Sequence, residues 1–334
     1  GKANWREKGK NIELSRWSCA TVYVSDRCLM DQLDLSIIIV SYNTRDYTLA
    51  ALKAIHDTVK THTYEVIVVE NASQDQSYEA IQKSFPQDVL LKTENLLGFS
   101  AANALGVQKA HGELLFFLNP DTKVHDGAID LLIEHLRSLP TCGAMTGQLL
   151  NPNGSIQPQG GSLPNLLNVA AWMFFIDDLP FLSKFFIPYQ QRDTEFFKRF
   201  QEHLGWIGGT ALLISKTLYE KIGGWDSAMT LYGEDVELCK RVHSAGKHIC
   251  LYPGSKIIHH QNKSTGSSHR AKIGEIEGLI YYWKKHYPPF QLPVLKAMLW
   301  IGSWLRILLF GILMRDESAR HTYFEAQKRV VMDR

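Results

Sequence analysis

The amino-acid sequence predicts an α/β fold with a doubly wound, mostly parallel sheet. Two short runs, Leu35–Val40 and Glu65–Val69, are nearly continuous in apolar, mainly β-branched residues, which is typical of strands buried on both faces. A segment with helical spacing of apolar residues lies between them. Strand and helix then keep alternating with short connections, and this alternation indicates parallel strands joined by helical crossovers.

The elements follow one another in a regular order up to residue 118. The first strand ends in a polar turn at 41–44, and Leu49, Leu52, Ile55 and Val59 then recur every three or four residues, as in a helix. The second strand ends at Glu70. The other elements expected in this half are a helix over 77–85, a short strand at 89–91, a helix over 99–110 and a strand at 113–118.

The second half of the chain shows a less regular alternation of predicted strands and helices. Residues 151–165 are rich in turn-forming residues and predict a mobile loop over a site, and residues 166–205 are aromatic and apolar. A compact region follows from Trp206. It is expected to contain a helix from near Ser215, a helix over 234–244, a strand at 248–252 and an apolar stretch at 256–259.

Composition limits the class of protein. The chain has 334 residues, 45% of them hydrophobic and 21% charged, which fits a globular protein with a sizeable core. The formal net charge of +2 carries no general polyanion-binding signature, so no nucleic-acid partner is expected. The oligomeric state has no signature in the sequence.

The cysteines and the N-terminus indicate a cytoplasmic catalytic part. Five scattered cysteines with no CxxC pair predict reduced thiols; they are Cys19, Cys28, Cys142, Cys239 and Cys250. Residues 1–34 are polar and lack the apolar core of a signal peptide. Residues 1–33 also show no clear period, and an irregular N-terminal arm is expected there.

The segment 292–314 is strongly apolar but is interrupted by Arg306 and flanked by Lys296 and Arg315. Its uninterrupted apolar run is shorter than the roughly 20 residues that a spanning helix needs. An interfacial helix with basic anchors is the preferred interpretation, and a core helix of the C-terminal region is the alternative.

The first candidate functional residues lie at the ends of the predicted strands. Ligands of doubly wound sheets bind beyond the carboxyl ends of the strands, which brings together the segments 41–43, 70–73 and 119–121. Asp121, in Asn119-Pro120-Asp121, has the oxygen ligands that a hard divalent cation prefers. The triplet alone is also typical of an ordinary turn, so its neighbours decide its meaning.

Two further pairs of residues qualify. Glu234 and Asp235 open a predicted helix, where acids are favoured by the helix dipole in any case, but either carboxylate could also act as a general base. A base at that position needs desolvation to offset the helix N-terminus. His259 and His260 follow an apolar stretch and qualify either as metal ligands or as structural histidines.

The ordered set of motifs resembles the inverting family-2 GT-A glycosyltransferases, especially the bacterial rhamnosyltransferase-like branch. The resemblance covers about residues 35–265. It is carried by the segments 36–43, 68–75, 95–103, 118–121, 208–214 and 233–238. It implies a GT-A catalytic domain over 34–265, with a nucleotide-binding half at about 34–150 and an acceptor half at about 151–265. Residues 266–334 form a C-terminal helical region.

The resemblance also implies roles for single residues. Asp121, with His259 or His260, corresponds to the site of Mg²⁺ or Mn²⁺ and of the diphosphate, and Asp235 of the Glu234–Asp235 pair corresponds to the catalytic base. Gly209 and Trp225 correspond to the acceptor side. The positions that correspond to donor contacts are Ser41, Tyr42, Asn43, Glu70, Asn71, Asn95, Gly98, Phe99, Asn103 and Asn119.

Two positions depart from the family pattern. Glu70 stands where the family usually has aspartate, which shifts the geometry of a contact to the nucleotide. Gln76 stands where it usually has glycine, which puts the tight turn after Asp75 in question.

The expected reaction is direct displacement with inversion, in which Asp235 deprotonates an acceptor hydroxyl and the cation neutralises the leaving diphosphate. The expected donor is dTDP-rhamnose, with a UDP-sugar as the second choice. The expected acceptor is a saccharide or lipid-linked saccharide of cell-surface polysaccharide synthesis, at the inner face of the cytoplasmic membrane. A nucleotidyltransferase and a non-catalytic nucleotide-sugar-binding module remain alternatives.

Overall fold

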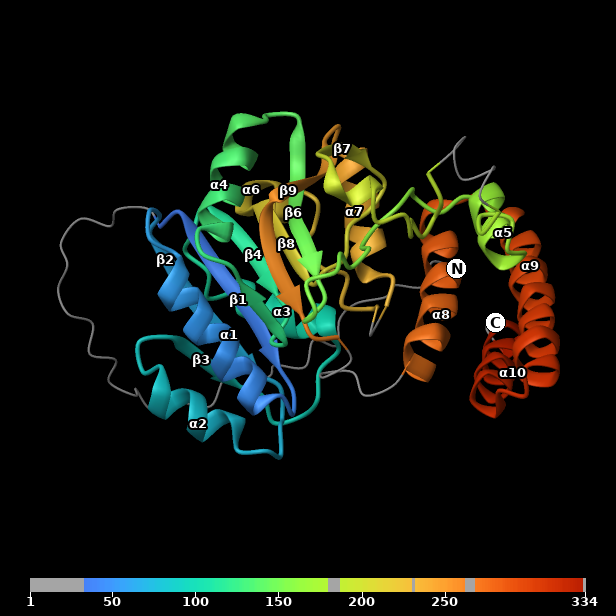
Figure 1. Cartoon of the computed structure of the whole chain (residues 1–334), viewed down its shortest axis with the longest axis horizontal. Helices are drawn as coiled ribbons and strands as arrows, with labels where there is room; N and C mark the ends of the chain where they lie inside the picture. The colour runs from blue at the N-terminus through green and yellow to red at the C-terminus, as the bar shows by residue number, and fades with distance from the viewer. Residues whose placement is uncertain (1–32, 180–186, 230–231, 262–267, 333–334) are drawn as a thin grey trace, which may run out of the picture. The chain divides into compact units, whose positions relative to one another are not determined.

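The computed structural model describes residues 33–179, 187–229, 232–261 and 268–332 (Figure 1). Residues 32–334 form one compact unit. The N-terminal arm expected over 1–33 lies outside the described residues, apart from Leu33.

The chain order of the elements alternates strands with helices in its first half and is mainly helical at its end. The elements are β1 (Leu35–Ser41), α1 (Arg45–Thr58), β2 (Tyr64–Glu70), α2 (Ser77–Ser84), β3 (Val89–Lys92), α3 (Phe99–Val107), β4 (Leu114–Leu118), β5 (Thr122–Val124), α4 (Ala128–Ser138), β6 (Cys142–Leu150), α5 (Leu166–Met173), η1 (Phe196–Lys198), β7 (Gln201–Leu204), β8 (Ala211–Ser215), α6 (Lys216–Lys221), α7 (Glu234–Ser244), β9 (His248–His259), α8 (Ser268–His286), α9 (Gln291–Arg306), η2 (Ile307–Leu313) and α10 (Glu317–Met332).

In the described residues the strands form one sheet, in the order β3–β2–β1–β4–β8–β6–β9–β5, and β7 pairs with β9. Strands β3, β2, β1 and β4 are mutually parallel, which confirms the predicted doubly wound half. Strand β8 runs antiparallel to both β4 and β6, and β6 is parallel to β9. The carboxyl ends of β1, β2 and β4 therefore meet at one edge, as the sequence predicted.

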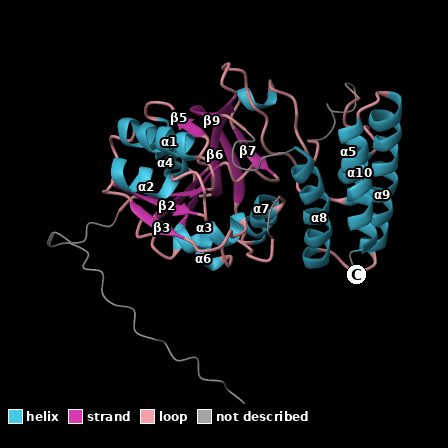
Figure 2. Cartoon of the chain, turned by 90° about the horizontal axis from the view of Figure 1, so that it is seen from below, coloured by secondary structure: helices cyan, strands magenta, loops and turns pink. Residues whose placement is uncertain are grey.

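Helices cover both faces of the sheet, as Figure 2 shows. Ile37 and Ile39 of β1 pack in the core that includes α1, α2 and α4. Ile38 points to the opposite core, which includes α3, α6 and α7. A buried strand must be apolar on both faces, and this explains why the strand signal in the sequence was continuous.

The sequence did not predict β5, β6, β7 or β8 as strands, and it predicted β9 only in part. Strand β6 is buried at all nine positions, but its sequence contains small and polar residues and carries no β-branched run. The predicted strand at 248–252 and the apolar stretch at 256–259 belong to one strand, β9. Pairing with β6 across a register irregularity keeps β9 continuous.

The C-terminal helices form a separate layer beside α7. Helices α5, α8, α9 and α10 share one hydrophobic core with Val236 of α7 and with Tyr189. Helix α5, which the sequence placed in the acceptor half, thus packs with the C-terminal helices. The predicted boundary between residues 265 and 266 lies outside the described residues.

Helix α9 continues through the π-helical turn η2, so Gln291–Leu313 is one helix of 23 residues. By length and composition alone it could cross a membrane, although 39% of its most apolar window is buried in the protein. The guanidinium of Arg306 is buried and donates to the carbonyl oxygens of Met173 and Trp172 in α5.

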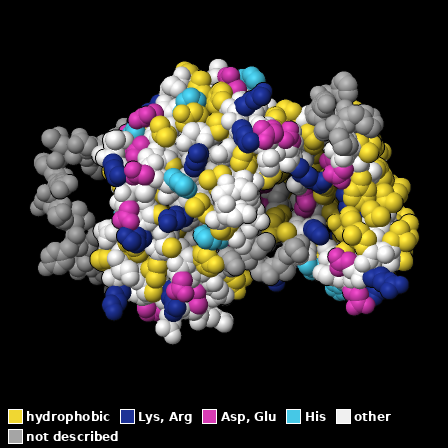
Figure 3. Space-filling view, in the orientation of Figure 1, with side chains coloured by type: hydrophobic (Ala, Val, Ile, Leu, Met, Phe, Trp, Pro, Cys, Tyr) yellow, Lys and Arg dark blue, Asp and Glu magenta, His cyan; other side chains and the backbone are white. Residues whose placement is uncertain are grey.

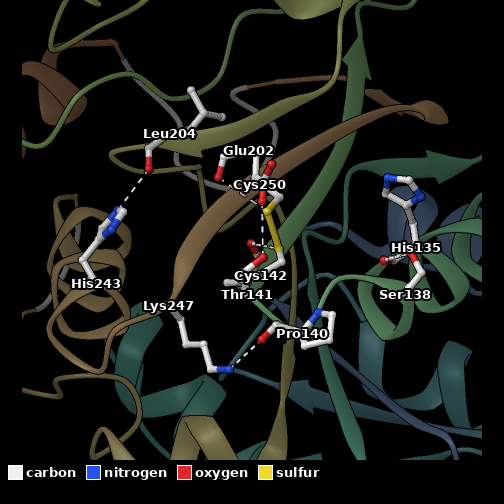
Figure 4. The surroundings of a disulfide bond; sticks show 11 residues. His135, Ser138, Pro140, Thr141, Cys142, Glu202, Leu204, His243, Lys247 and Cys250 are labelled. Carbon is white, nitrogen blue, oxygen red and sulfur yellow. Dashed lines mark hydrogen bonds between the residues drawn. A yellow bond between two sulfur atoms is a disulfide. The ribbon is translucent and has the colours of Figure 1, made fainter.

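The prediction of reduced thiols is wrong for two cysteines. Cys142 at the start of β6 and Cys250 in β9 are joined by a disulfide across 108 residues of chain (Figure 4). Spacing along the sequence could not reveal this pair, because the parallel pairing of β6 with β9 brings the two residues together. Cys239 is a free, buried thiol.

Candidate active site

The first part of the site is the edge where β1 and β2 end. Ser41 and Glu70 are register partners there, and the N–H of Asn71 donates to the carbonyl oxygen of Ser41 at 2.8 Å. The Ser41 hydroxyl is fully buried and bonds to the Thr44 and Thr48 hydroxyls. Ser41 therefore holds the turn between β1 and α1 through its side chain.

Glu70 combines a structural bond with an unused carboxylate oxygen. Its side chain is 1% exposed, and one oxygen accepts a 2.7 Å bond from the N–H of Ser73. Among the described residues, the other oxygen, Oε2, is buried and has no hydrogen-bond partner. A buried carboxylate oxygen without a partner is costly, so Glu70 remains a good candidate for a ligand contact despite its extra methylene.

The turn at 42–43 is tied to the end of β2. Asn43 takes a left-handed conformation, with φ at 50°, and its side-chain oxygen accepts from the N–H of Gln74 at 2.8 Å. Tyr42 beside it is partly exposed. Gln76 also has a positive φ, of 64°. The tight turn that a glycine usually forms in the family is therefore present here with a glutamine in the left-handed conformation.

The segment 95–103 lies beside this edge and is held by Asn71. The Asn71 side chain bonds both the N–H and the carbonyl oxygen of Leu97. Gly98 precedes helix α3, and Asn103 is buried and bonds the carbonyl oxygen of Phe99. Asn95 is exposed. Asn71 and Asn103 thus act on the backbone, while Asn95 has a side chain free to meet solvent or ligand.

The second part of the site centres on Asp121. Its carboxylate is 1% exposed, and neither oxygen has a hydrogen-bond partner in the described part of the chain. His259 Nε2 lies 3.4 Å from Asp121 Oδ1. Two buried carboxylate oxygens without donors, with a histidine nitrogen beside them, match the donor set of a divalent cation.

Gln157 sets the orientation of His259. Its side-chain oxygen lies 2.7 Å from His259 Nδ1, and its amide nitrogen donates to the Asn151 side-chain oxygen and to the carbonyl oxygen of His259. The sequence predicted a mobile loop over 151–165. In the structure this segment instead buries Gln157 and Gln159 within the site.

The other candidates at this position contribute through the backbone. The N–H of His260 donates to the carbonyl oxygen of Asp121, and the His260 ring packs against Tyr47 at 5.2 Å between centroids. The N–H of Asn119 donates to the carbonyl oxygen of Thr210. His259 rather than His260 therefore faces the Asp121 carboxylate. Among the described residues, no group of three or more His, Cys, Asp and Glu side chains forms a metal site.

The third part of the site is the start of α7. Asp235 Oδ1 accepts from its neighbour's N–H, and Asp235 Oδ2 accepts a 3.2 Å bond from the N–H of Gly209. Burial raises the pKa of Asp235 and outweighs these donors. Burial, together with the nearby Asp235, raises the pKa of Glu234 to about 8. The desolvation that a base at a helix N-terminus needs is therefore present.

Gly209 and Trp225 shape the wall beside Asp235. A methyl group on Gly209 would lie 3.3 Å from the Phe99 ring and 3.4 Å from Trp225. Trp225 is only 4% exposed and packs edge-on against Phe99 and Phe117. Trp225 thus supports the wall of the site from the core and offers little surface to an acceptor.

A buried ion cluster fixes α7 to α8. Burial alone would raise the pKa of Glu237, but hydrogen bonds from His286, Arg241 and Lys285 outweigh it and lower the pKa to about 2. Lys285 also bonds Asp226, next to Trp225. The helix that carries Asp235 is therefore anchored at several points.

A family profile described as Glycosyl transferase family 2 matches residues 36–195, which include Glu70, Asp121 and Gln157. The chain therefore contains a glycosyltransferase family 2 domain. It is an enzyme that uses a nucleotide-sugar donor, and this replaces the nucleotidyltransferase and binding-module alternatives that the sequence left open.

Curated relatives point to cell-surface glycans. Over 213 residues the glycosyltransferase is 27% identical to the N-acetylglucosaminyl-diphospho-decaprenol L-rhamnosyltransferase of Mycobacterium tuberculosis, covering 60% of this chain and 68% of the relative. It is also 27% identical over 207 residues to the O-antigen biosynthesis protein RfbC of Myxococcus xanthus, covering 60% of this chain and 15% of the relative.

Solved structures agree on the fold. The mannosyltransferase PcManGT from Pyrobaculum calidifontis, solved with GDP-Man and Mn²⁺, aligns with a TM-score of 0.52 and 16% identity over 90% of this chain and 76% of its own. GalNAc-T7, solved with UDP, GalNAc and Mn²⁺, aligns with a TM-score of 0.55 and 14% identity over 76% of this chain and 49% of its own. These likenesses confirm the predicted GT-A fold.

Proposed function

We propose that this enzyme transfers a sugar from a nucleoside-diphosphate donor to a lipid-linked saccharide with inversion at the anomeric carbon. The observation that carries the proposal is the pairing of two sites along one sheet edge. Asp121 offers two unpaired carboxylate oxygens on one side, and Asp235 offers a partly exposed carboxylate with a raised pKa on the other.

Asp121 and His259 would hold the divalent cation, Mg²⁺ or Mn²⁺. A bound cation would neutralise the charge that develops on the leaving diphosphate. The protein offers only these two ligands in its described part, so donor diphosphate oxygens and water would complete the coordination. Gln157 positions the His259 ring from behind, as partners of metal-bound histidines commonly do.

Asp235 carries out the proton transfer in the proposed reaction. The acceptor hydroxyl donates its proton to Asp235 as its oxygen forms a bond to the anomeric carbon. The bond between that carbon and the phosphate oxygen breaks at the same time, and its electron pair leaves with the nucleoside diphosphate. The N–H of Gly209, bonded to Asp235 Oδ2, fixes the direction of the carboxylate.

The relatives support a choice of substrates. The Mycobacterium tuberculosis relative is named as transferring L-rhamnose to a diphospho-decaprenol-linked N-acetylglucosamine. On that basis dTDP-rhamnose is the proposed donor and a polyprenyl-diphosphate-linked amino sugar is the proposed acceptor, with a UDP-sugar as the second donor. A cytoplasmic enzyme at the inner face of the membrane fits both substrates.

A donor panel tests this function. Purified enzyme is incubated with each nucleotide-sugar, Mg²⁺ or Mn²⁺ and an N-acetylglucosaminyl-diphospho-lipid, and nucleoside diphosphate release and the glycolipid product are measured. We expect product with dTDP-rhamnose, inverted at the anomeric carbon, and none from an Asp121→Asn variant. Release of pyrophosphate without a new glycolipid would contradict the proposal.

The exposed face of α9 and η2 fits a membrane surface. Trp300 and Trp304 lie one helical turn apart on this face, as aromatic side chains do at lipid headgroups. Figure 3 shows hydrophobic side chains gathered where α9 lies in Figure 1. The exposed apolar residues of this face are Val294, Trp300, Ile301, Trp304, Leu305, Leu308, Leu309, Ile312, Leu313 and Met314.

Vesicle sedimentation tests the membrane contact. Wild-type enzyme and a Trp300→Ser, Trp304→Ser, Leu308→Ser triple variant are spun with vesicles of phosphatidylcholine and phosphatidylglycerol. We expect the wild type to sediment with the vesicles and the triple variant to stay in the supernatant with an unchanged far-UV spectrum. Equal sedimentation of both proteins would contradict membrane contact through this face.

A further inference from the structure

Gly208 opens a small space between the two halves of the site. A methyl group placed on Gly208 would lie 3.7 Å from Gln159 Oε1 and 3.8 Å from both Asp235 Oδ2 and Thr210 Oγ1. These are ordinary van der Waals distances, and no atom beyond the two neighbouring residues of the chain comes closer. Three oxygen atoms from separate segments therefore border one space that would take a small chemical group.

The Gln159 side chain is held in one orientation. Its amide nitrogen donates to the Gly147 carbonyl oxygen at 2.8 Å and to the Thr146 hydroxyl at 3.1 Å. A carbonyl can only accept, so the amide nitrogen must point toward Gly147 and the amide oxygen toward the space at Gly208.

The Gln159 oxygen lacks a partner in the described chain. Gln159 is 8% exposed, and its Oε1 atom is buried without a hydrogen bond. Gly208 and Thr210 themselves are partly exposed, so the space is open on the side of the site. Buried amide oxygens are nearly always bonded, and an unbonded one beside the base indicates that a ligand supplies the donor.

We propose that Gln159 is a specificity-determining residue that accepts a hydrogen bond from the acceptor sugar. The reacting hydroxyl donates to Asp235 Oδ2, and a hydroxyl or amide N–H on the neighbouring ring carbon donates to Gln159 Oε1. Thr210 Oγ1 borders the same space as a further polar contact. This inference rests on the proposed transferase function and adds the chemistry by which the acceptor is recognised.

The proposed acceptor contact and the cation site are served by two different side chains of one short segment. Gln157 points to His259 and the cation position, while Gln159, two residues later, points to Gly208 and Asp235. In extended backbone, residues i and i+2 point to the same face, so a single short segment can support the cation site through Gln157 and contact the acceptor through Gln159. The strand-like bridge of Ile156 to Leu150 supports this extended path.

Gln159→Met, Gly208→Ala and Thr210→Val test the proposal from three sides. Gln159→Met keeps the length and removes the oxygen, Gly208→Ala fills the space, and Thr210→Val removes the hydroxyl. Gln148→Met is the matched control, because Gln148 is equally buried and bonds a carbonyl oxygen, that of Phe197, outside the site. Thermal shift with dTDP and Mn²⁺ reports whether each variant folds and binds nucleotide.

With dTDP-rhamnose and the N-acetylglucosaminyl-diphospho-lipid, we expect kcat/KM for the acceptor to fall at least about 10-fold in Gln159→Met and Gly208→Ala. KM for the donor should stay unchanged, and the Gln148→Met control should keep full activity. Full activity in Gly208→Ala, or an equal loss in donor and acceptor KM, would overturn the assignment.

A binding measurement separates this proposal from the choice of substrates. Saturation-transfer NMR is recorded with the methyl glycoside of N-acetylglucosamine on protein loaded with dTDP and Mn²⁺. We expect a signal with wild type and with Gln148→Met and its loss with Gly208→Ala, even when the wild type transfers no rhamnose. Absence of signal with the wild type, or an equal signal with Gly208→Ala, would overturn the acceptor site itself.

Discussion

Gln157 Oε1 lies 2.7 Å from Nδ1 of His259, and this contact assigns the proton on the histidine ring. The Gln157 amide nitrogen is committed to other acceptors, so its oxygen faces the ring and Nδ1 must carry hydrogen. Nε2, which points to Asp121, then bears the lone pair. The tautomer that a metal ligand requires is therefore set by a residue outside the coordination sphere.

Replacing Gln157 by Leu should weaken Mn²⁺ binding by about 10- to 100-fold, because the ring loses its orientation. Calorimetric titration of Mn²⁺ into dTDP-loaded enzyme measures this directly, without an activity assay. Gln148→Leu serves as the control for loss of a buried amide. Identical Mn²⁺ affinity in the Gln157 and Gln148 variants would refute the role given to Gln157.

Replacing Asp235 by Asn should reduce transfer by about 10²- to 10⁴-fold, because the amide cannot take the acceptor proton. The Asn side chain can still accept the Gly209 N–H, so the nucleotide site should remain intact. Product formation and the thermal shift with dTDP and Mn²⁺ are measured in parallel. An Asn variant with wild-type turnover would show that Asp235 is not the base.

Glu234 should make the fold less stable as the pH rises. Its pKa is 4.5 in the unfolded chain and about 8 in the native state. Between these pH values the native state therefore holds a proton that the unfolded chain has released. Stability attributable to Glu234 is fully present below about pH 4.5 and declines up to about pH 8. A Glu234→Gln variant should therefore gain in Tm over the wild type progressively across that window.

Glu237 should have the opposite effect on the pH dependence of stability, and the same Tm measurement tests it. Its native pKa of about 2 lies below the unfolded value of 4.5, so it stabilises the fold above about pH 4.5 and loses this effect as the pH falls toward 2. Glu237→Gln should lower Tm at neutral pH, and its difference from wild type should shrink in acid. Parallel pH curves for both variants would contradict these assignments.

Gly112→Ala should destabilise the protein by about 1–3 kcal/mol through overpacking. An added methyl group would lie 2.4 Å from the Ser36 nitrogen and 2.5 Å from the Leu35 carbonyl carbon, and backbone cannot move aside cheaply. Gly208→Ala meets no such contact and should unfold at the wild-type urea midpoint. A Gly112→Ala midpoint equal to that of wild type would be the contrary result.

The first half of the fold was predictable because its signals are local. Buried parallel strands such as β1 must be apolar on both faces, and helix α7 was predicted over its observed residues. Strand β6 was missed because its burial comes from its neighbours: Gly143 and Gly147 fit tight contacts with side chains of other segments. That information lies in the tertiary structure and leaves no periodic signal.

Site residues could be predicted from the sequence where a reactive side chain stands at the end of a predicted strand or helix. They could not be predicted where tertiary packing alone brings the side chain to the site. Asp121 and Asp235 were identified from strand and helix ends. Trp225 and Ser41 were expected at the acceptor and donor sites; in the structure Trp225 is buried in packing and the Ser41 hydroxyl bonds within the turn, and their substrate roles remain predictions. Gln157 and Gln159 were passed over, because turn-forming neighbours made their segment resemble a loop. Their spacing of two residues was the signal available for a shared face.

The buried guanidinium of Arg306 also predicts how the enzyme behaves in cell fractionation. Helix α9 could enter a bilayer fully only by withdrawing this charge from the carbonyl oxygens of Met173 and Trp172. That withdrawal would leave a cation and two carbonyl groups without partners, at a cost of several kcal/mol. Alkaline carbonate should therefore release the enzyme from sealed membranes without detergent, as it does proteins that rest on one leaflet.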